Sequence, residues 1–221
     1  MPFTVDFHIH TASSYDSLNK PESIIKKVIQ KKLDAAIVLD HDTVKGGLQT
    51  ASINNSDAII IPAIEVATDI GDIIGFYIRK EIKVREYHQV IDEIHAQKGL
   101  VILPHPYHKH ELKDDLFQLV DLIEINNSRI SEEKNQMAAE LAQKHNLPTV
   151  SGSDAHFLWE IGNCTTVFEN IPSSKDELIA EILKGKRTHR VKLSGKTNVI
   201  ASQVLKYINK PESLKKRLSK L

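Results

Sequence analysis

The feature that most constrains the fold of this chain is a regular alternation along its length. Short runs rich in β-branched residues alternate with longer amphipathic segments, which is the pattern of strand–helix units around a parallel sheet or barrel. Strands are expected near residues 4–7, 36–39, 59–64, 73–78, 100–103, 122–125, 149–150 and 165–168. Helices are expected near residues 21–32, 44–51, 84–98, 131–145 and 175–184. The predicted fold class is therefore α/β.

The length of the chain, 221 residues, suits one large domain better than two small ones. The alternating pattern runs through residues 1–190, which we expect to form that domain. Residues 191–221 are a basic tail with a weaker pattern, which we expect to be helical and to pack on, or extend from, the same domain. Within this tail, residues 211–221 fit a basic amphipathic helix, and a solvated helical face is the simpler interpretation of their charges.

Composition excludes several classes of protein. The 29 basic and 29 acidic side chains give a net charge of zero, so no broad attraction to nucleic acid or to an anionic membrane is expected. No apolar run approaches the roughly 20 residues needed to cross a bilayer, and the first residues lack the pattern of a signal peptide. Cys164 is the single cysteine, which excludes an intramolecular disulfide and a Cys-based zinc module. We expect a cytoplasmic protein in which Cys164 is a buried strand residue.

Histidine is the unusual component, with 11 of 221 residues. Imidazoles and carboxylates follow the ends of five predicted strands. They are His8, His10, Asp40, His41, Asp42, Glu65, His105, Asp154 and His156. Because the carboxyl ends of parallel strands open onto one face of a barrel, these side chains are expected to meet there. Nitrogen and oxygen ligands without thiolate suit Zn, Mn or Fe, and bridging carboxylates allow a cluster of several ions.

Each of these groups is a weak signal by itself. His8 and His10 lie two residues apart, so on a strand both side chains point to the same side, as two nitrogens on one metal would. Exposed histidines are common, however, and residues 40–42 alone would also fit a polar loop or a helix cap. The metal interpretation depends on the joint arrangement of imidazoles and carboxylates after several strands.

Four motifs and an intervening glutamate carry a family resemblance. In order they are DFHIHTASSYDS (residues 6–17), LDHDTVKGG (39–47), LPHP (103–106) and GSDAH (152–156), with the glutamate in PAIEVAT. Together they resemble the PHP family, the polymerase and histidinol phosphatase superfamily of metal-dependent phosphoesterases, over roughly residues 5–186. The resemblance implies a PHP metallophosphoesterase domain over residues 1–190. Its fold would be a distorted (β/α)7-type, TIM-like barrel with two or three divalent ions, Mn, Fe or Zn, at its open end.

The resemblance also implies three groups of metal ligands. Their members are His8, His10, Glu65 and Asp154 for a first ion, Glu65 and His105 for a second, and Asp16, His41 and His156 for a third. Where many relatives carry a histidine after the glutamate, this chain has Asp72, which we include as a ligand of the second ion. Oxygen ligation of this kind would favour Mn or Fe over Zn.

Other polar residues are assigned to supporting roles. Asp40 and Asp42 are interpreted as acceptors for the free N–H of a ligating imidazole, with direct ligation as the alternative. The resemblance places Asn127 and Arg129 at the site, where the guanidinium would bind phosphate oxygens in pairs. The alternative for Arg129 is an ion pair with a nearby carboxylate at the start of a helix. Lys45 and Lys109 are weaker candidates for binding phosphate.

The remaining histidines and the loops receive simpler interpretations. His108 and His110 lie on a loop near the expected site, where contact with substrate and plain exposure are equal alternatives. The others are interpreted as surface residues: His88, His95, His145 and His189. The segment between His105 and Glu124 is short, so little material is available for a lid and an open site is expected. The sequence carries no indication of the oligomeric state.

Such a cluster supports hydrolysis of a phosphate ester by a metal-bound hydroxide. Arg129 and the ions would hold the phosphate, and His41, His156 or a metal-bound water would protonate the leaving oxygen. We therefore expect a phosphoric ester hydrolase that acts on a small nucleotide-like or sugar-like phosphomonoester. One alternative is a 3′–5′ exonuclease or other nuclease, against which the neutral net charge argues. The other is a non-catalytic domain stabilised by its metals, against which the complete ligand set argues.

Overall fold

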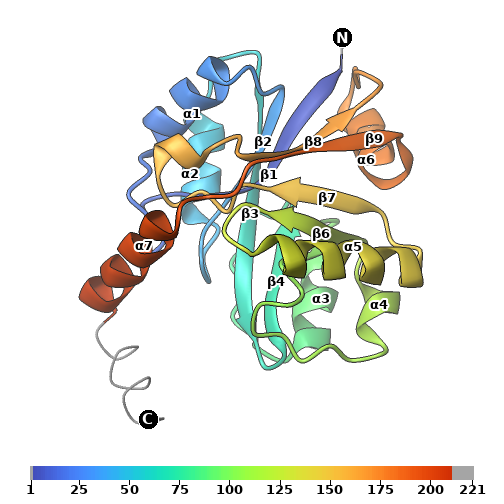
Figure 1. The fold of residues 1–221 in the computed structure, drawn as a ribbon. Helices are drawn as coiled ribbons and strands as arrows, with labels where there is room; N and C mark the ends of the chain where they lie inside the picture. The colour runs from blue at the N-terminus through green and yellow to red at the C-terminus, as the bar shows by residue number, and fades with distance from the viewer. Residues whose placement is uncertain (1, 211–221) are drawn as a thin grey trace.

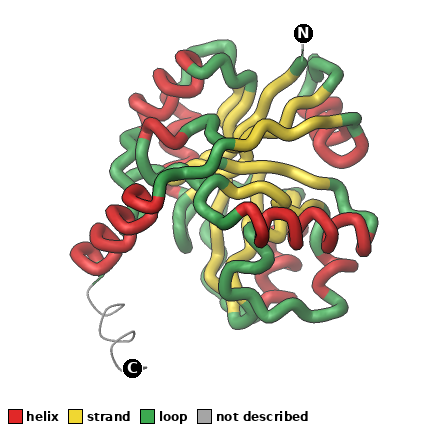
Figure 2. Tube along the Cα trace, in the orientation of Figure 1, coloured by secondary structure: helices red, strands yellow, loops and turns green. Residues whose placement is uncertain are grey.

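The computed structural model describes residues 2–210, which form a mixed sheet with helices around it. The sheet curls into a nearly closed barrel (Figures 1 and 2). Its strand order is β7-β6-β5-β4-β3-β2-β1-β8-β9. The strands are β1 (Phe3–His10), β2 (Ala35–Leu39), β3 (Ile59–Thr68), β4 (Gly71–Phe76), β5 (Leu100–Leu103), β6 (Leu122–Asn127), β7 (Thr149–Gly152), β8 (Cys164–Phe168) and β9 (Arg187–Val191). The predicted α/β, TIM-like barrel is confirmed.

The helices follow the predicted order, with two additions. Five lie where they were expected: α1 (Pro21–Gln30), α2 (Lys45–Ile53), α3 (Tyr87–Ala96), α5 (Glu132–His145) and α6 (Lys175–Lys184). A sixth, α7 (Lys196–Asn209), lies in the tail that was expected to be helical, and the additions are α4 (Leu116–Leu119) and the 3-10 helix η1 (Leu158–Glu160). Local chemistry explains several helix ends. Pro21 needs no N–H partner in the first turn of α1, and the Ser131 side chain accepts from the backbone of Lys134 at the start of α5.

Strand direction determines which residues reach the site. The pairs β1–β2, β2–β3, β5–β6 and β6–β7 are parallel. β4 is antiparallel to both β3 and β5, so its first residues lie at the same end of the barrel as the last residues of β3. Asp72, the second residue of β4, is therefore delivered to the carboxyl end of the parallel strands.

A bulge in β1 allows one strand to serve both the core and the site. Phe7 belongs to the hydrophobic cluster formed by side chains from eight strands, which fills the barrel interior. The register with β2 shifts just before Ile9, and Ile9 packs outward against α1. A bulge of this kind resets the alternation of side chains. As a result His8 and His10 both point toward the carboxylates at the barrel mouth.

The barrel closes where the segment after β7 meets β1. The Ala155 N–H donates to the His8 carbonyl (3.2 Å), and the His10 N–H donates to the Ala155 carbonyl (3.0 Å). The Ser151 N–H donates to Oγ1 of Thr166 on β8 (2.8 Å). These bonds hold the residues that follow β7 directly beside the histidines of β1.

The region after α6 differs most from expectation. β9 pairs antiparallel with β8, so the predicted boundary at residue 190 falls inside a strand of the same sheet. His189 lies in β9 rather than on a free surface, and its ring contacts Oγ1 of Thr149 (3.0 Å) and Oγ of Ser151 (2.8 Å). Residues 211–221, for which a basic helix was considered, lie outside the described residues. Of the helices in residues 2–210, none combines the length and the apolar character needed to cross a membrane.

Candidate metal centre

The nine side chains expected as metal ligands meet at the carboxyl end of the parallel strands. They arrive on separate elements: β1 and the loop after it, the end of β2, β3, the start of β4, and the loops after β5 and β7. They are His8, His10, Asp16, His41, Glu65, Asp72, His105, Asp154 and His156. The three groups of the sequence analysis remain recognisable in space.

The first group has the spacing of ligands on a single ion. The Nε2 atoms of His8 and His10 lie 3.1 Å apart. Oδ1 of Asp154 lies 3.5 Å and 3.3 Å from these two nitrogens, and Oε2 of Glu65 lies 3.8 Å and 3.5 Å from them. Donors about 2.1 Å from a tetrahedral ion would be about 3.4 Å from one another. The four donor atoms therefore surround a space of the right size for a divalent ion.

The second group shares Glu65 with the first. Nε2 of His105 lies 3.1 Å from Oε1 of Glu65, which leaves Oε2 directed at the first group. A carboxylate oxygen of Asp72 lies within 4.8 Å of donor atoms from both residues. Glu65 is thus placed to bridge two ions, and Asp72 is close enough to take part in the second.

The third group is built around Asp16. Oδ2 of Asp16 lies 3.4 Å from Nε2 of His41, and Oδ1 lies 3.3 Å from Nε2 of His156. His41 also presents its Nδ1 to Oε2 of Glu65 at 3.0 Å. Donor atoms of His10, His41 and His156 lie within 4.8 Å of one another. The third group is therefore continuous with the first.

Two carboxylate oxygens without hydrogen-bond partners in the described part of the chain indicate whether a cation fits among these residues. Oδ1 of Asp16 and Oε2 of Glu65 are buried and have no hydrogen-bond partner within residues 2–210. Buried polar atoms normally have a partner, and a carboxylate oxygen can be satisfied by a metal ion as well as by a donor. Both oxygens face imidazole nitrogens, so the donor set fits a cluster of divalent ions.

A pocket of about 260 Å3 opens onto the cluster. Its floor is formed by the second and third groups and by Asp154, and its sides by the loop after β5, the loop after β6 and α7. A hollow of about 550 Å3 at the opposite end of the barrel is larger, but its lining contains no histidine. The chemistry is concentrated at one end of the molecule.

Comparison with known proteins found one matching family model and two similar sequences. A family model described as PHP-associated matches residues 132–187. Two uncharacterized proteins of Methanocaldococcus jannaschii are similar in sequence. One is 28% identical over 242 aligned positions, covering 93% of this chain and 98% of that protein. The other is 31% identical over 138 positions, covering 56% of this chain and 81% of that protein.

Solved structures share the fold. A two-domain protein of Bacteroides vulgatus that contains a predicted PHP-like metal-dependent phosphoesterase matches with a TM-score of 0.72 at 16% identity, over 91% of this chain and 69% of that one. The PHP-associated family model and the fold shared with this structure support an assignment to the PHP superfamily. The lesion-specific endonuclease EndoQ of Pyrococcus furiosus matches with a TM-score of 0.57 at 17% identity, over 86% of this chain and 58% of that one.

Glu124 is a residue near the cluster that the sequence analysis did not assign to the site. Its Oε1 lies 3.1 Å from Nδ1 of His8, and its Oε2 accepts from the backbone N–H of His105 at 2.9 Å. A carboxylate on the far nitrogen of a ligating imidazole fixes the ring orientation and leaves the other nitrogen for the metal. The available signal was a carboxylate inside a short apolar strand, because Glu124 is the third residue of β6 and is buried.

The roles expected of Asp40 and Asp42 are only partly supported. Asp40 reaches His10 through Ser14, whose hydroxyl donates to Oδ1 of Asp40 (2.7 Å) and contacts Nδ1 of His10 (3.1 Å). The prediction for Asp42 is wrong. Its Oδ1 accepts from the backbone N–H of Ala67 and pairs with Arg85 at 3.3 Å, and Asp42 makes no contact with an imidazole in the described part of the chain.

Asn127 was expected to face the substrate, and this expectation needs correction. The residue is fully buried. Its amide nitrogen donates to Glu124 (3.0 Å) and to Asp154 (3.3 Å), and its oxygen accepts from the backbone N–H of Arg129 (2.9 Å). A side chain without exposed surface cannot touch a bound substrate, so Asn127 positions two carboxylates beneath the site.

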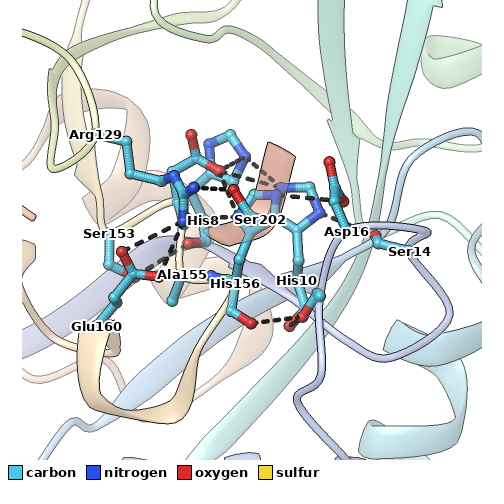
Figure 3. A network of polar contacts seen from close by, with 12 residues as sticks. His8, His10, Ser14, Asp16, Arg129, Ser153, Ala155, His156, Glu160 and Ser202 are labelled. Carbon is cyan, nitrogen blue, oxygen red and sulfur yellow. Dashed lines mark hydrogen bonds and ion pairs between the residues drawn. The ribbon is translucent and has the colours of Figure 1, made fainter. Parts of the chain in front are cut away.

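Arg129 lines the pocket, but most of its N–H donors bond to other groups of the protein. Its NH1 pairs with Glu160 at 3.0 Å, and its NH2 donates to the hydroxyl of Ser202 and to the carbonyl of Asn198 (3.4 Å). Figure 3 shows the guanidinium between Glu160 and Ser202, beside His156. This arrangement corresponds to the ion-pair alternative, and a phosphate contact by Arg129 stays a prediction.

The loop residues considered for substrate contact differ in whether they line the pocket. Lys109 and His108 line the pocket, whereas Lys45 is exposed at the start of α2 and does not. His110 packs on Gly71, and its Nε2 contacts the backbone carbonyl of Asp72 at 2.8 Å. The expectation of an open site also needs correction. The loop after β5 is indeed short, but α7 supplies Val199, Ser202, Gln203 and Lys206 to the pocket.

Without bound ions the buried charges compensate one another. Burial opposes ionisation of Glu65, but the charges of His41 and His8 outweigh it and hold the pKa of Glu65 well below its usual value. Burial would also raise the pKa of Asp154, but the charge of His8 lowers it by more, so the pKa of Asp154 lies well below its usual value. Burial likewise lowers the pKa of His8, but Asp154 and Glu124 raise it well above 6.5. These imidazoles therefore carry protons that a metal ion must displace.

Proposed function

We propose that this PHP domain is a metal-dependent phosphoric ester hydrolase that acts on a small phosphomonoester. The observation that carries the proposal is the convergence of nine imidazoles and carboxylates on one pocket, with two buried carboxylate oxygens left without hydrogen-bond partners. Ligand sets of imidazole nitrogens and carboxylate oxygens, without thiolate, are typical of ions that catalyse hydrolysis.

Three sets of residues would hold two or three divalent ions of Mn, Fe or Zn. They are His8, His10, Glu65 and Asp154 for the first ion, Glu65, Asp72 and His105 for the second, and Asp16, His41 and His156 for the third. When bound, such ions lower the pKa of a coordinated water and neutralise charge on the phosphoryl oxygens.

The protein contributes position and charge. Glu124, Ser14 and the carbonyl of Asp154 contact the outward nitrogens of three imidazoles, which holds each ring with its other nitrogen toward the cluster. With only two ions bound and the third group free, His41 is the better candidate to protonate the leaving oxygen, because its side chain is 17% exposed against 7% for His156. Lys109 and Arg129 are the candidates on the pocket wall for holding phosphate.

Pocket size supports a small substrate over a nucleic acid strand. The volume of about 260 Å3 lies just below the range of roughly 300–1,000 Å3 that holds drug-sized ligands. A single phosphate ester fits this space, and the net charge of zero offers no extended basic surface for a phosphodiester backbone. A nuclease is the second candidate, because the endonuclease of Pyrococcus furiosus shares the fold.

Phosphate release tests the proposal directly. With Mn present, the wild type should hydrolyse at least one member of a panel of nucleotide and sugar monophosphates, and EDTA should abolish the activity. His8→Ala and Asp154→Ala should each lower kcat by about 100-fold or more, because each removes a metal ligand. His95→Ala, at an exposed position of α3, is the matched control and should leave kcat unchanged.

The same assay separates the alternatives. Degradation of a labelled oligonucleotide at 0.1 M salt, without turnover of monoesters, would favour the nuclease. Metal-replete protein that turns over neither class would favour a non-catalytic domain. Activity that survives EDTA or either ligand substitution would contradict the mechanism itself.

A further inference from the structure

α7 presents one face to the candidate site. Val199, Ser202, Gln203 and Lys206 line the pocket that opens onto the metal ligands. Their spacing of i, i+3, i+4 and i+7 is that of residues on a single helical face. Figure 1 shows α7 beside the barrel end away from the N-terminus. A helix from the basic tail thus forms one wall of a site whose other walls come from the barrel.

Two anchors fix α7 relative to the metal ligands. At its first turns, Arg129 donates to the carbonyl of Asn198 and to the hydroxyl of Ser202, while its NH1 pairs with Glu160. At its last turn, the Asn209 side chain donates to the backbone carbonyl of Tyr15 at 2.8 Å. Both anchors are in segments that carry site residues, so the position of α7 is coupled to the position of the cluster.

Lys206 lies next to the third ligand group. Its ammonium is 4.9 Å from the centre of the Tyr15 ring and 3.4 Å from the Tyr15 hydroxyl. The same ring stacks on His41, with centroids 4.8 Å apart and planes at 11°. Lys206 therefore lines the pocket with only the Tyr15 ring between its ammonium and His41, an expected metal ligand.

The charge of Lys206 is less compensated than that of the other cation on this wall. Arg129 is paired with the fully buried carboxylate of Glu160. In the described part of the chain no carboxylate lies within ion-pair distance of Lys206, whose ammonium contacts the hydroxyl and the ring of Tyr15. An ammonium held at a pocket wall without an acidic partner is suited to pairing with an anionic ligand.

We propose that Lys206 binds the phosphate group of the substrate, and that α7 is the wall that limits substrate size. This assignment rests on the phosphate-ester hydrolysis proposed above. A phosphate seated between the cluster and α7 would receive one charge-assisted hydrogen bond from Lys206, and the rest of the substrate would have to leave the pocket past Lys109 on the opposite loop.

The test is binding of inorganic phosphate to the full-length, Mn-loaded protein, measured by calorimetry. Lys206→Met should weaken phosphate binding roughly ten- to hundredfold, because it removes a hydrogen bond between charged groups. Lys206→Arg should keep most of the affinity. Lys196→Met is the matched control: it removes the same charge from the exposed first residue of α7 and should bind phosphate as the wild type does. Melting temperatures of all variants establish that each is folded.

Kinetics with an ester that the wild type hydrolyses gives a second readout. Lys206→Met should raise KM more than it lowers kcat. If the wild type hydrolyses the ester, and wild type and Lys206→Met bind phosphate equally well, the assignment of Lys206 is overturned and the proposed function stands. Phosphate binding that depends on Lys206 in a protein without any turnover counts against the proposed function alone. Wild-type protein that binds no phosphate overturns both.

Discussion

Residues that are not themselves expected ligands hold the imidazoles in the orientation that metal binding requires. Glu124 contacts both the ring of His8 and the backbone of His105, and Asn127 holds Glu124 in turn. The side chains that meet at the barrel mouth could be predicted, because a histidine or carboxylate at a strand end is visible in the sequence. The support by Glu124 was not predicted, and Asn127 was expected to face the substrate, because the contacts of both residues form only when β6 lies between β5 and β7.

Glu124→Gln should weaken Mn binding about 10- to 100-fold. The amide would turn a donor toward either His8 or the His105 N–H, so one of the two hydrogen bonds must be lost. Mn affinity measured by calorimetry checks this, with Glu133→Gln on the exposed surface of α5 as the control. Equal affinity in Glu124→Gln and wild type would show that Glu124 does not support the centre.

Metal binding should release protons near neutral pH. His8 and His41 have pKa values well above 6.5, because burial, which lowers them, is outweighed by Asp154 and Glu124 for His8 and by Glu65 and Asp16 for His41. Both rings are protonated at pH 7 without metal and must lose that proton to coordinate it.

Calorimetry in two buffers with different ionisation enthalpies measures this release. We expect about two protons per protein at pH 7, one from each ring, and an apparent Mn affinity that increases from pH 6 to pH 8. Glu65 and Asp154 add no protons, because their pKa values are lowered. Identical heats in both buffers would contradict the prediction.

At the scale of elements, the least predictable parts are the ones that complete the site. The alternation indicated β1 through β8, but periodicity does not encode strand direction, so the antiparallel setting of β4 that delivers Asp72 was not foreseen. β9 has mostly exposed or half-buried side chains, and α7 carries apolar residues on its outer face, such as Ile200 and Ile208. Neither shows the clean periodicity from which elements are predicted.

The anchor of α7 should matter for stability. Arg129→Met would leave Glu160 buried without its cationic partner, although backbone N–H groups of residues 156 and 157 still donate to it. Breaking one side of a buried ion pair typically costs about 3–5 kcal/mol, so we expect a loss near the lower end of that range in urea denaturation. Arg190→Met, an exposed position on β9, is the control. A variant of normal stability that has lost phosphate binding would instead assign Arg129 to the substrate.

β9 should make stability sensitive to acid through His189. Burial, together with the charge of Arg187, lowers the pKa of His189 to about 4. In the unfolded chain His189 binds a proton near pH 6.5. The contribution of His189 to the free energy of unfolding is therefore fully present above that pH. It is lost as the pH falls toward 4, because the proton binds more strongly to the unfolded chain.

His189→Gln should remove this acid sensitivity. Between pH 7 and pH 4.5 the wild type should lose up to about 3 kcal/mol more unfolding free energy than the variant, and less to the extent that the half-buried ring is solvated. Urea denaturation of metal-free protein at the two pH values measures the difference. Parallel pH profiles for wild type and variant would place the acid sensitivity elsewhere.

For the whole molecule, the barrel separates stability from chemistry. Its interior is filled by apolar side chains from eight strands, and the buried imidazoles and carboxylates are gathered at the carboxyl end of the parallel strands. This division explains why the fold class and the side chains that meet at the barrel mouth could be predicted from motifs, whereas the helix that covers the site could not be placed. Ligand positions follow from strand ends, but the path of a tail across the barrel depends on contacts such as Arg129 with Ser202.

A crystal structure of Mn-soaked protein with anomalous data collected at the Mn edge tests the central claim most directly. The account predicts two or three peaks, each about 2.1 Å from donor atoms of its group. One peak should lie among His8, His10, Glu65 and Asp154, and a second beside Glu65 and His105. Anomalous density confined to other parts of the surface, with these donor atoms bonded only to one another, would contradict it.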